Sequence, residues 1–203
     1  MELKKALVIF MIIAVAVIAA GVTVGELFIW DKYDVVDPVD KDIAYFESMA
    51  GKQKDNDKVL VELGWLYYRK GDYQKAINTL TKAVEINRLN PSAHFNLGLA
   101  YQEAGLLEKA QTEFQKTLDL DPESKFAYFA LGKLYFLREK WDEAIGQFKL
   151  AAEKDPASAD NYYWLGRSYE KKGYEEEALA AYQKVLAMVP DHSEAKEAYY
   201  RLK

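Results

Sequence analysis

The strongest hydrophobic pattern near the start of the chain is one long apolar segment. Residues 6–25 carry no charged side chain. Twenty helical residues span about 30 Å, which is the thickness of the hydrocarbon core of a bilayer. Trp30 and Tyr33 follow the segment, and such rings favour the membrane–water interface. The pattern predicts a membrane anchor over residues 1–30, with a transmembrane helix over about residues 6–30.

Charges on the two sides of this segment predict its orientation. Two lysines precede it, whereas five Asp and two Lys follow within residues 31–42. Because cytoplasmic flanks are enriched in Lys and Arg, we expect a single-pass protein of the cytoplasmic membrane with its N-terminus inside. A cleaved signal peptide is the alternative, with Ala19-Ala20-Gly21 as a weak cleavage site, although the apolar run exceeds a usual signal core. Both interpretations place the remaining chain on the extracytoplasmic side.

The rest of the chain repeats one pattern of apolar and small residues every 34 positions. Each copy has Leu-Gly, a Tyr three residues after the Gly, then an Ala and a bulky residue on a second apolar stripe. The glycines are Gly64, Gly98, Gly132 and Gly166, the alanines are Ala76, Ala110, Ala144 and Ala178, and the bulky residues are Leu80, Phe114, Phe148 and Tyr182. Pro122, Pro156 and Pro190 keep the same step. The pattern predicts two helices per copy, which approach closely where Gly and Ala are small.

This order of Leu-Gly, Tyr, Ala, bulky residue and Pro at a 34-residue period resembles the tetratricopeptide-repeat (TPR) family. The resemblance implies helix–turn–helix copies that stack into a right-handed superhelix with a concave surface. We therefore expect an all-α protein, in which an N-terminal transmembrane helix is followed by a TPR superhelix. The four full copies are expected at residues 57–90, 91–124, 125–158 and 159–192.

Three shorter segments complete the expected organisation. Residues 31–40 are interpreted as an acidic spacer. Residues 41–56 are interpreted as a degenerate half-repeat that caps the first copy, with a helix over residues 41–50. Residues 193–203 carry a helical apolar stripe and are expected to form a C-terminal capping helix.

The turn inside the third copy departs from the pattern. First helices end at Gly71, Gly105 and Gly173, where a left-handed residue is wanted. The third copy has Arg138-Glu139-Lys140 and no Gly at this point. We expect this turn to be strained or differently shaped.

Composition excludes several classes of function. The chain has no Cys and only two His, which do not stand at metal-ligand spacing. It contains no Gly-rich phosphate loop and no nucleophile elbow. A net charge of -5 without a basic cluster argues against nucleic acid. We expect no enzyme activity, cofactor, metal or small-molecule substrate, and therefore a function in binding protein or peptide partners.

The TPR resemblance also implies that a partner binds the inner face of the first helices. The positions that match this face are mostly apolar, and two cations stand toward the C-terminal end: Val61, Trp65, Tyr68, Phe95, Leu99, Phe126, Phe129, Lys133, Phe136, Tyr163 and Arg167. An apolar surface of this kind is expected to be covered by a binding partner or by another part of the protein. We expect a groove for an apolar or amphipathic peptide or helix, with the two cations meeting an acidic residue or a terminal carboxylate. The alternatives are that some rings pack between neighbouring first helices, or that residues 31–50 or a second copy fill the groove.

The leading hypothesis is a membrane-anchored scaffold or adaptor that assists assembly of a membrane-associated complex. A chaperone-like client holder, as in cytochrome c maturation or in pilus and secretion assembly, is an alternative. A structural subunit of a larger membrane complex is another, since Gly21 and Gly25 have a spacing that permits helix packing in a bilayer. The carboxylate-clamp class of TPR co-chaperones is rejected, because only Asn96 of the five matching positions agrees with that class.

Overall fold

Residues 37–203 are described in the computed structural model of this chain. The chain divides into two units between residues 41 and 42, and only residues 37–41 of the first unit are described. The membrane anchor predicted over residues 1–30 and most of the predicted spacer lie outside the described residues. Between residues 37 and 203, no helix is both long enough and apolar enough to cross a membrane.

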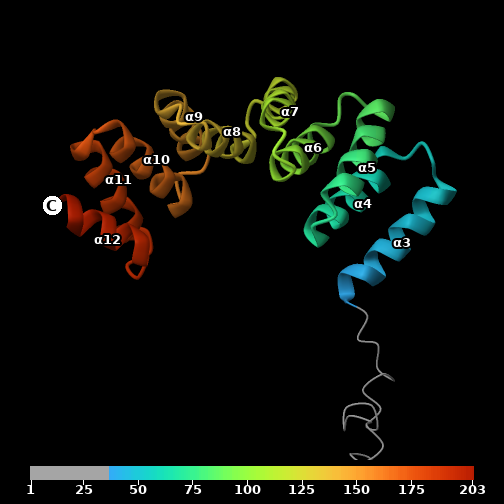
Figure 1. Cartoon of the computed structure of the whole chain (residues 1–203), viewed down its shortest axis with the longest axis horizontal. Helices are drawn as coiled ribbons and strands as arrows, with labels where there is room; N and C mark the ends of the chain where they lie inside the picture. The colour runs from blue at the N-terminus through green and yellow to red at the C-terminus, as the bar shows by residue number, and fades with distance from the viewer. Residues whose placement is uncertain (1–36) are drawn as a thin grey trace, which may run out of the picture. The chain divides into compact units, whose positions relative to one another are not determined.

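Every regular element in the described part is an α-helix, and short turns join consecutive helices (Figure 1). The expected all-α, helix–turn–helix architecture is therefore confirmed. The helices are α3 (Pro38–Lys52), α4 (Asp57–Lys70), α5 (Tyr73–Ile86), α6 (Pro91–Glu103), α7 (Leu107–Leu120), α8 (Lys125–Leu137), α9 (Trp141–Lys154), α10 (Ala159–Lys172), α11 (Glu175–Met188) and α12 (Ser193–Leu202). The first helices of the four copies are α4, α6, α8 and α10, and the second helices are α5, α7, α9 and α11.

Side chains just before several first helices explain where these helices begin. Asn56, Asn90 and Ser158 each accept a hydrogen bond from a backbone N–H of the first turn of α4, α6 or α10. Such caps satisfy donors that have no partner within the helix. Pro91 stands at the start of α6, where its missing N–H costs nothing. The helix boundaries are thus encoded by local chemistry, copy by copy.

Helix α3 begins earlier than the sequence predicts. It starts at Pro38, so the last residues of the segment interpreted as a spacer are helical. The Tyr67 hydroxyl on α4 donates a hydrogen bond to Glu47 of α3 at 2.5 Å. Burial, together with this hydrogen bond, raises the pKa of Tyr67 to about 12. The hydroxyl therefore keeps its proton at neutral pH and continues to donate.

The core of each copy is built on one close approach between its two helices. The bulky residues Leu80, Phe114, Phe148 and Tyr182 on the second helices are fully buried. A methyl group placed on Gly98 or Gly132 would stand 2.6 Å from the facing Phe114 or Phe148 ring, which is closer than packed carbon atoms approach. Glycine is thus required because the ring occupies the space that a side chain would need.

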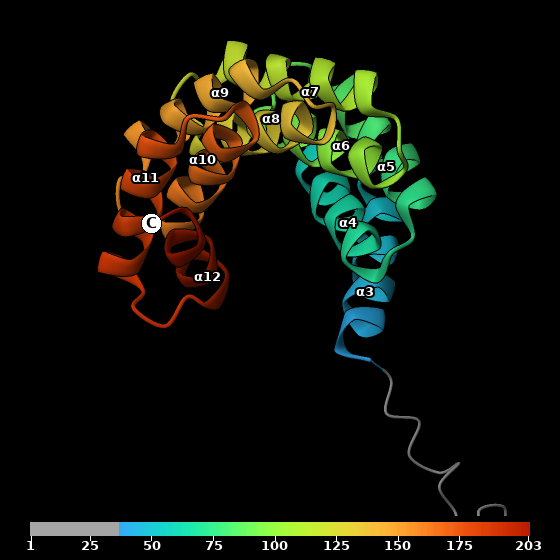
Figure 2. The ribbon, with the colours of Figure 1, turned by 60° about the vertical axis from the view of Figure 1, so that its left-hand side comes forward.

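Residues 42–203 form an arc in which the first helices line the inner side (Figure 2). The second helices lie on the outer side. Helix α12 packs on α11 through Ala195 and Ala198, both buried. It lies where the sequence predicts a capping helix.

The turn of the third copy keeps the shape of the others although it lacks glycine. Glu139 has a φ of 58°, beside 84° at Gly71, 75° at Gly105 and 82° at Gly173. A left-handed conformation costs a residue with a Cβ about 1–2 kcal/mol. The expectation of a strained turn is therefore confirmed.

Two glycines of the third copy provide a matched test of the close approach between α8 and α9. Gly132→Ala is expected to lower the free energy of unfolding by about 1–3 kcal/mol, because the methyl group collides with the Phe148 ring. Gly146→Ala in α9 is expected to raise it by about 1 kcal/mol, because no atom lies within 4 Å of the added methyl and alanine favours helix. Urea unfolding of a fragment starting at residue 37 measures both, and changes of equal sign would contradict the packing described.

Candidate partner-binding groove

The residues predicted to line a groove all lie on the first helices, and these helices line the inner side of the arc (Figure 2). Helix α4 carries Val61, Trp65 and Tyr68, α6 carries Phe95 and Leu99, α8 carries Phe126, Phe129, Lys133 and Phe136, and α10 carries Tyr163 and Arg167. Their exposure differs widely. Val61 and Phe136 are buried, Phe126 is 62% exposed, and the others are half-buried. The residues predicted to line the groove therefore do not form one uniform binding surface.

Three of these aromatic rings support the core as well as the groove. Phe95, Phe129 and Tyr163 each contact the bulky ring of their own second helix, with centroid distances of 5.8 Å to Phe114, 5.7 Å to Phe148 and 6.2 Å to Tyr182. These three rings therefore do more than pack between neighbouring first helices. These rings form the fixed floor of the inner face.

The N-terminal half of the inner face contains an apolar cavity of about 520 Å³. It spans α4, α6 and α8, and its lining consists of Val61, Glu62, Trp65, Ser92, Phe95, Asn96 and Phe126. Trp65 stacks on Tyr68 at a centroid distance of 5.2 Å. Burial raises the pKa of Tyr68, and the nearby Glu103 carboxylate raises it further. The cavity thus joins three copies and offers an exposed ring, Phe126, at its edge.

The C-terminal half of the inner face centres on Trp164, which the sequence interpretation missed. The Lys133 Nζ lies 5.0 Å and the Arg167 Cζ 4.7 Å from the centroid of its ring. Phe136 packs edge-on against the same ring at 5.2 Å. Trp164 stands one position after Tyr163 and so falls outside the expected stripe. The signal that could have revealed it is that the same position holds Glu62, Asn96 and Ala130 in the other copies.

A polar cavity of about 350 Å³ lies between α10 and α12, and Arg167 lines it together with Glu170, Glu194 and Glu197. Glu170 at its wall accepts hydrogen bonds from Arg201 at 2.6 Å and from the Tyr182 hydroxyl at 2.9 Å. Burial raises the pKa of Tyr182, and the bond to Glu170 adds to the effect. The negative charge of Glu170 is therefore already balanced by Arg201 within the protein.

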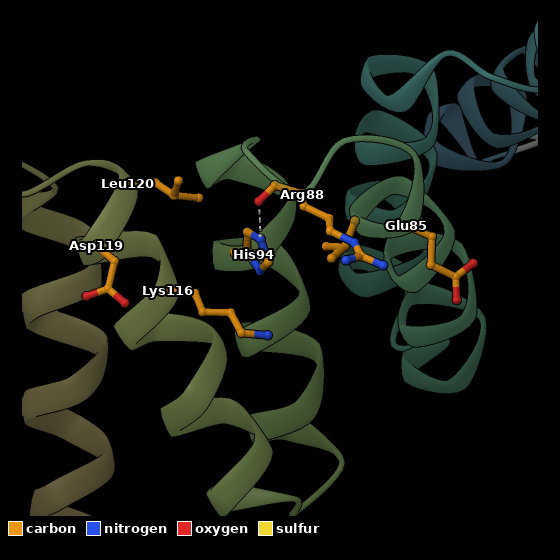
Figure 3. Close-up of a pocket in the computed structure, with 7 residues that line it drawn as sticks. Glu85, Arg88, His94, Lys116, Asp119 and Leu120 are labelled. Carbon is orange, nitrogen blue, oxygen red and sulfur yellow. Dashed lines mark hydrogen bonds between the residues drawn. The ribbon is translucent and has the colours of Figure 1, made fainter.

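A second large cavity, of about 510 Å³, lies away from the inner face between α5, α6 and α7 (Figure 3). Its charged lining alternates Glu85 and Asp119 with Arg88 and Lys116. The buried His94 ring contacts the Glu113 carboxylate through Nδ1 at 2.6 Å and the Arg88 carbonyl through Nε2 at 3.0 Å. Both ring nitrogens are engaged, so His94 serves the fold. Across residues 37–203, no three His, Asp or Glu side chains gather in a group that could hold a metal ion.

Family models match the repeated part of the chain. One described as TPR repeat matches residues 64–105 and 132–173, and one described as tetratricopeptide repeat matches residues 91–124 and 159–192. Together they span more than half of the chain. The chain is a tetratricopeptide-repeat protein. No protein of curated function matches it in a sequence comparison.

Solved TPR structures share this fold. MamA is 24% identical with a TM-score of 0.68, and the alignment covers 82% of this chain and 98% of that protein. YrrB, described as a TPR protein with an unusual peptide-binding site, is 25% identical with a TM-score of 0.69, covering 82% and 86%. MamA from Desulfovibrio magneticus RS-1, from residue 41 to its end, is 22% identical with a TM-score of 0.63, covering 72% and 92%.

Two substitutions separate a ring that supports this TPR fold, Trp164, from a ring that is mostly exposed, Phe126. Trp164→Ala is expected to lower the free energy of unfolding by about 2–4 kcal/mol, because it removes contacts with Phe136 and Phe148. Phe126→Ala is expected to change it by no more than about 0.5 kcal/mol, because that ring is 62% exposed. Urea unfolding of the residue 37–203 fragment measures both. A large loss for Phe126→Ala would mean that this ring belongs to the core.

Proposed function

We propose that this protein is a membrane-anchored TPR scaffold that binds an apolar or amphipathic segment of a protein partner on its inner face. The binding assists assembly of a complex beside the membrane. The observation that carries the proposal is the cavity of about 520 Å³ on α4, α6 and α8, with Phe126 at its edge 62% exposed.

The energetics of this cavity favour an apolar anchor from the partner. Burying an aromatic side chain removes about 150–250 Å² of its surface from water, and each Å² of apolar surface contributes about 25 cal/mol. Trp65 and Phe126 would gain cover in the same step, whereas Glu62, Ser92 and Asn96 supply polar groups at the rim. An apolar centre with a polar rim is the usual anatomy of an interface.

The comparison with YrrB adds support, because that TPR protein is described as having a peptide-binding site. From YrrB we carry over to this chain only the class of ligand, a peptide. The apolar part of the predicted groove on α4, α6 and α8 suits an apolar face of a helix or extended peptide.

The membrane anchor is proposed from the sequence of residues 6–30 and from the charge difference across it. The charge difference predicts that the repeats lie on the extracytoplasmic side. A partner bound there would be held close to the membrane surface, which raises its local concentration for assembly.

Site-specific photo-cross-linking tests partner binding on the inner face. Benzoylphenylalanine placed at position 126 is expected to form adducts with a partner segment in native membranes, because that position borders the apolar cavity. The matched control carries the same group at position 137, on the same helix and similarly exposed at 59%. Mass spectrometry of the adducts identifies the segment. Adducts at position 137 without adducts at position 126 would contradict the proposed site.

Membrane anchoring is tested by charge insertion. Ala14→Arg with Val17→Arg is expected to release the chain from the membrane fraction, since each Arg at a helix centre costs about 2.5–3.5 kcal/mol of insertion free energy. Carbonate extraction followed by immunoblotting measures release, and intact mass shows whether the first residues are retained. The wild-type chain appearing in the soluble fraction at its full mass would refute the anchor.

A further inference from the structure

We propose that the C-terminal half of the inner face binds the carboxylate of an acidic side chain within the partner segment, through Lys133 and Arg167. This inference rests on the proposed function and specifies the chemistry of the partner. The segment would combine an apolar anchor, held at the cavity beside Phe126, with an Asp or Glu held at the two cations.

The inner face changes character along one row of equivalent positions. Trp65, Leu99, Lys133 and Arg167 stand 34 residues apart, on α4, α6, α8 and α10 respectively. The first two are apolar and the last two are cationic. A partner lying along the row therefore meets apolar surface at one end and positive charge at the other.

Aromatic rings place the Arg167 guanidinium before any ligand arrives. Its Cζ lies 5.0 Å from the Phe136 centroid, 5.8 Å from Tyr163 and 4.7 Å from Trp164. Rings attract a cation through their faces, and a guanidinium packed on rings still has planar N–H donors that match a carboxylate. The side chain is thus ordered without using the groups that would bind the ligand.

Lys133 and Arg167 share the Trp164 ring, and Arg167 also lines a polar cavity with Glu170, Glu194 and Glu197. Within residues 37–203 neither cation has a carboxylate at ion-pair distance, unlike Arg201, which pairs with Glu170 at 2.6 Å. The two like charges repel each other, and Glu170 is further engaged by Tyr182. A carboxylate from a partner would relieve that repulsion and would lose little entropy in ordering the cations.

The position of the cation pair favours an internal acidic residue over a chain end. Helix α12 lies beyond α10 along the arc (Figure 2), so a segment that runs from the apolar cavity to the cation pair can extend past Arg167 toward α12. Neighbouring helices stand about 8–10 Å apart, so roughly 15 Å separates the cavity from the pair. An extended peptide covers that distance in about four or five residues.

A peptide array tests the inference with the full-length chain in lipid nanodiscs. The probes are immobilised 12-residue peptides, each carrying one Trp and, four or five residues away on either side, Glu or Gln. One set has an amidated C-terminus and a parallel set has a free C-terminal carboxylate. We expect the Glu peptides to bind about threefold to tenfold more tightly than the Gln peptides, and the preference to weaken at high salt.

The variant Lys133→Gln with Arg167→Gln is expected to lose the preference for Glu but to retain binding of the Trp anchor. The matched control is Lys109→Gln with Lys149→Gln, which removes two cations of the second helices that lie over the rings of Tyr101 and Tyr169 and should leave the preference unchanged. Circular dichroism melting of each variant verifies that it is folded.

The possible outcomes separate this inference from the proposed function. Binding of the Trp peptides without a preference for Glu overturns the acidic subsite and leaves the apolar groove standing. A Glu preference that survives in the Lys133 and Arg167 double variant also overturns it. If only peptides with a free C-terminal carboxylate bind, the ligand is a chain end and the internal acid is refuted. No binding of any peptide overturns the groove itself.

Discussion

The close contact between a bulky side chain on each second helix and a glycine on the first helix sets the geometry of the whole array. Phe114 lies against Gly98 and Phe148 against Gly132, where even a methyl group would collide. This contact determines how near the two helices of a copy approach, and therefore how the next copy stacks on them. Because the same contact recurs at a 34-residue period, small rotations accumulate into the arc of residues 42–203 (Figure 2).

The same bulky rings connect the core to the inner face. Phe114 touches Phe95, and Phe148 touches Phe129, so groove side chains rest on core side chains. The floor of the groove is thus as rigid as the core beneath it, which lowers the entropy lost when a partner binds. Phe126, near the start of α8, is an exception and remains 62% exposed.

The repeat pattern predicted the helices well because each copy carries its own local signals. Caps, glycines and the 34-residue period act within a copy, and even the strain at Glu139 follows from comparing one copy with the next. Pro38 as a helix start was missed, although proline is favoured in the first turn of a helix. The burial of Val61 and Phe136 and the role of Trp164 were also missed, because they depend on contacts between copies that a single-copy pattern does not contain.

Contacts between copies also explain how an acidic chain can hold a cationic subsite. The net charge of -5 is spread along the sequence, whereas Lys133 and Arg167 are brought to one ring by the stacking of α8 on α10. Physiological salt screens the distant acids of the chain. Of the three glutamates that share a cavity with Arg167, Glu170 is already engaged by Arg201 and Tyr182. Apolar burial at the cavity would then supply most of the affinity, while the cation pair would select among apolar segments and set their direction along the groove.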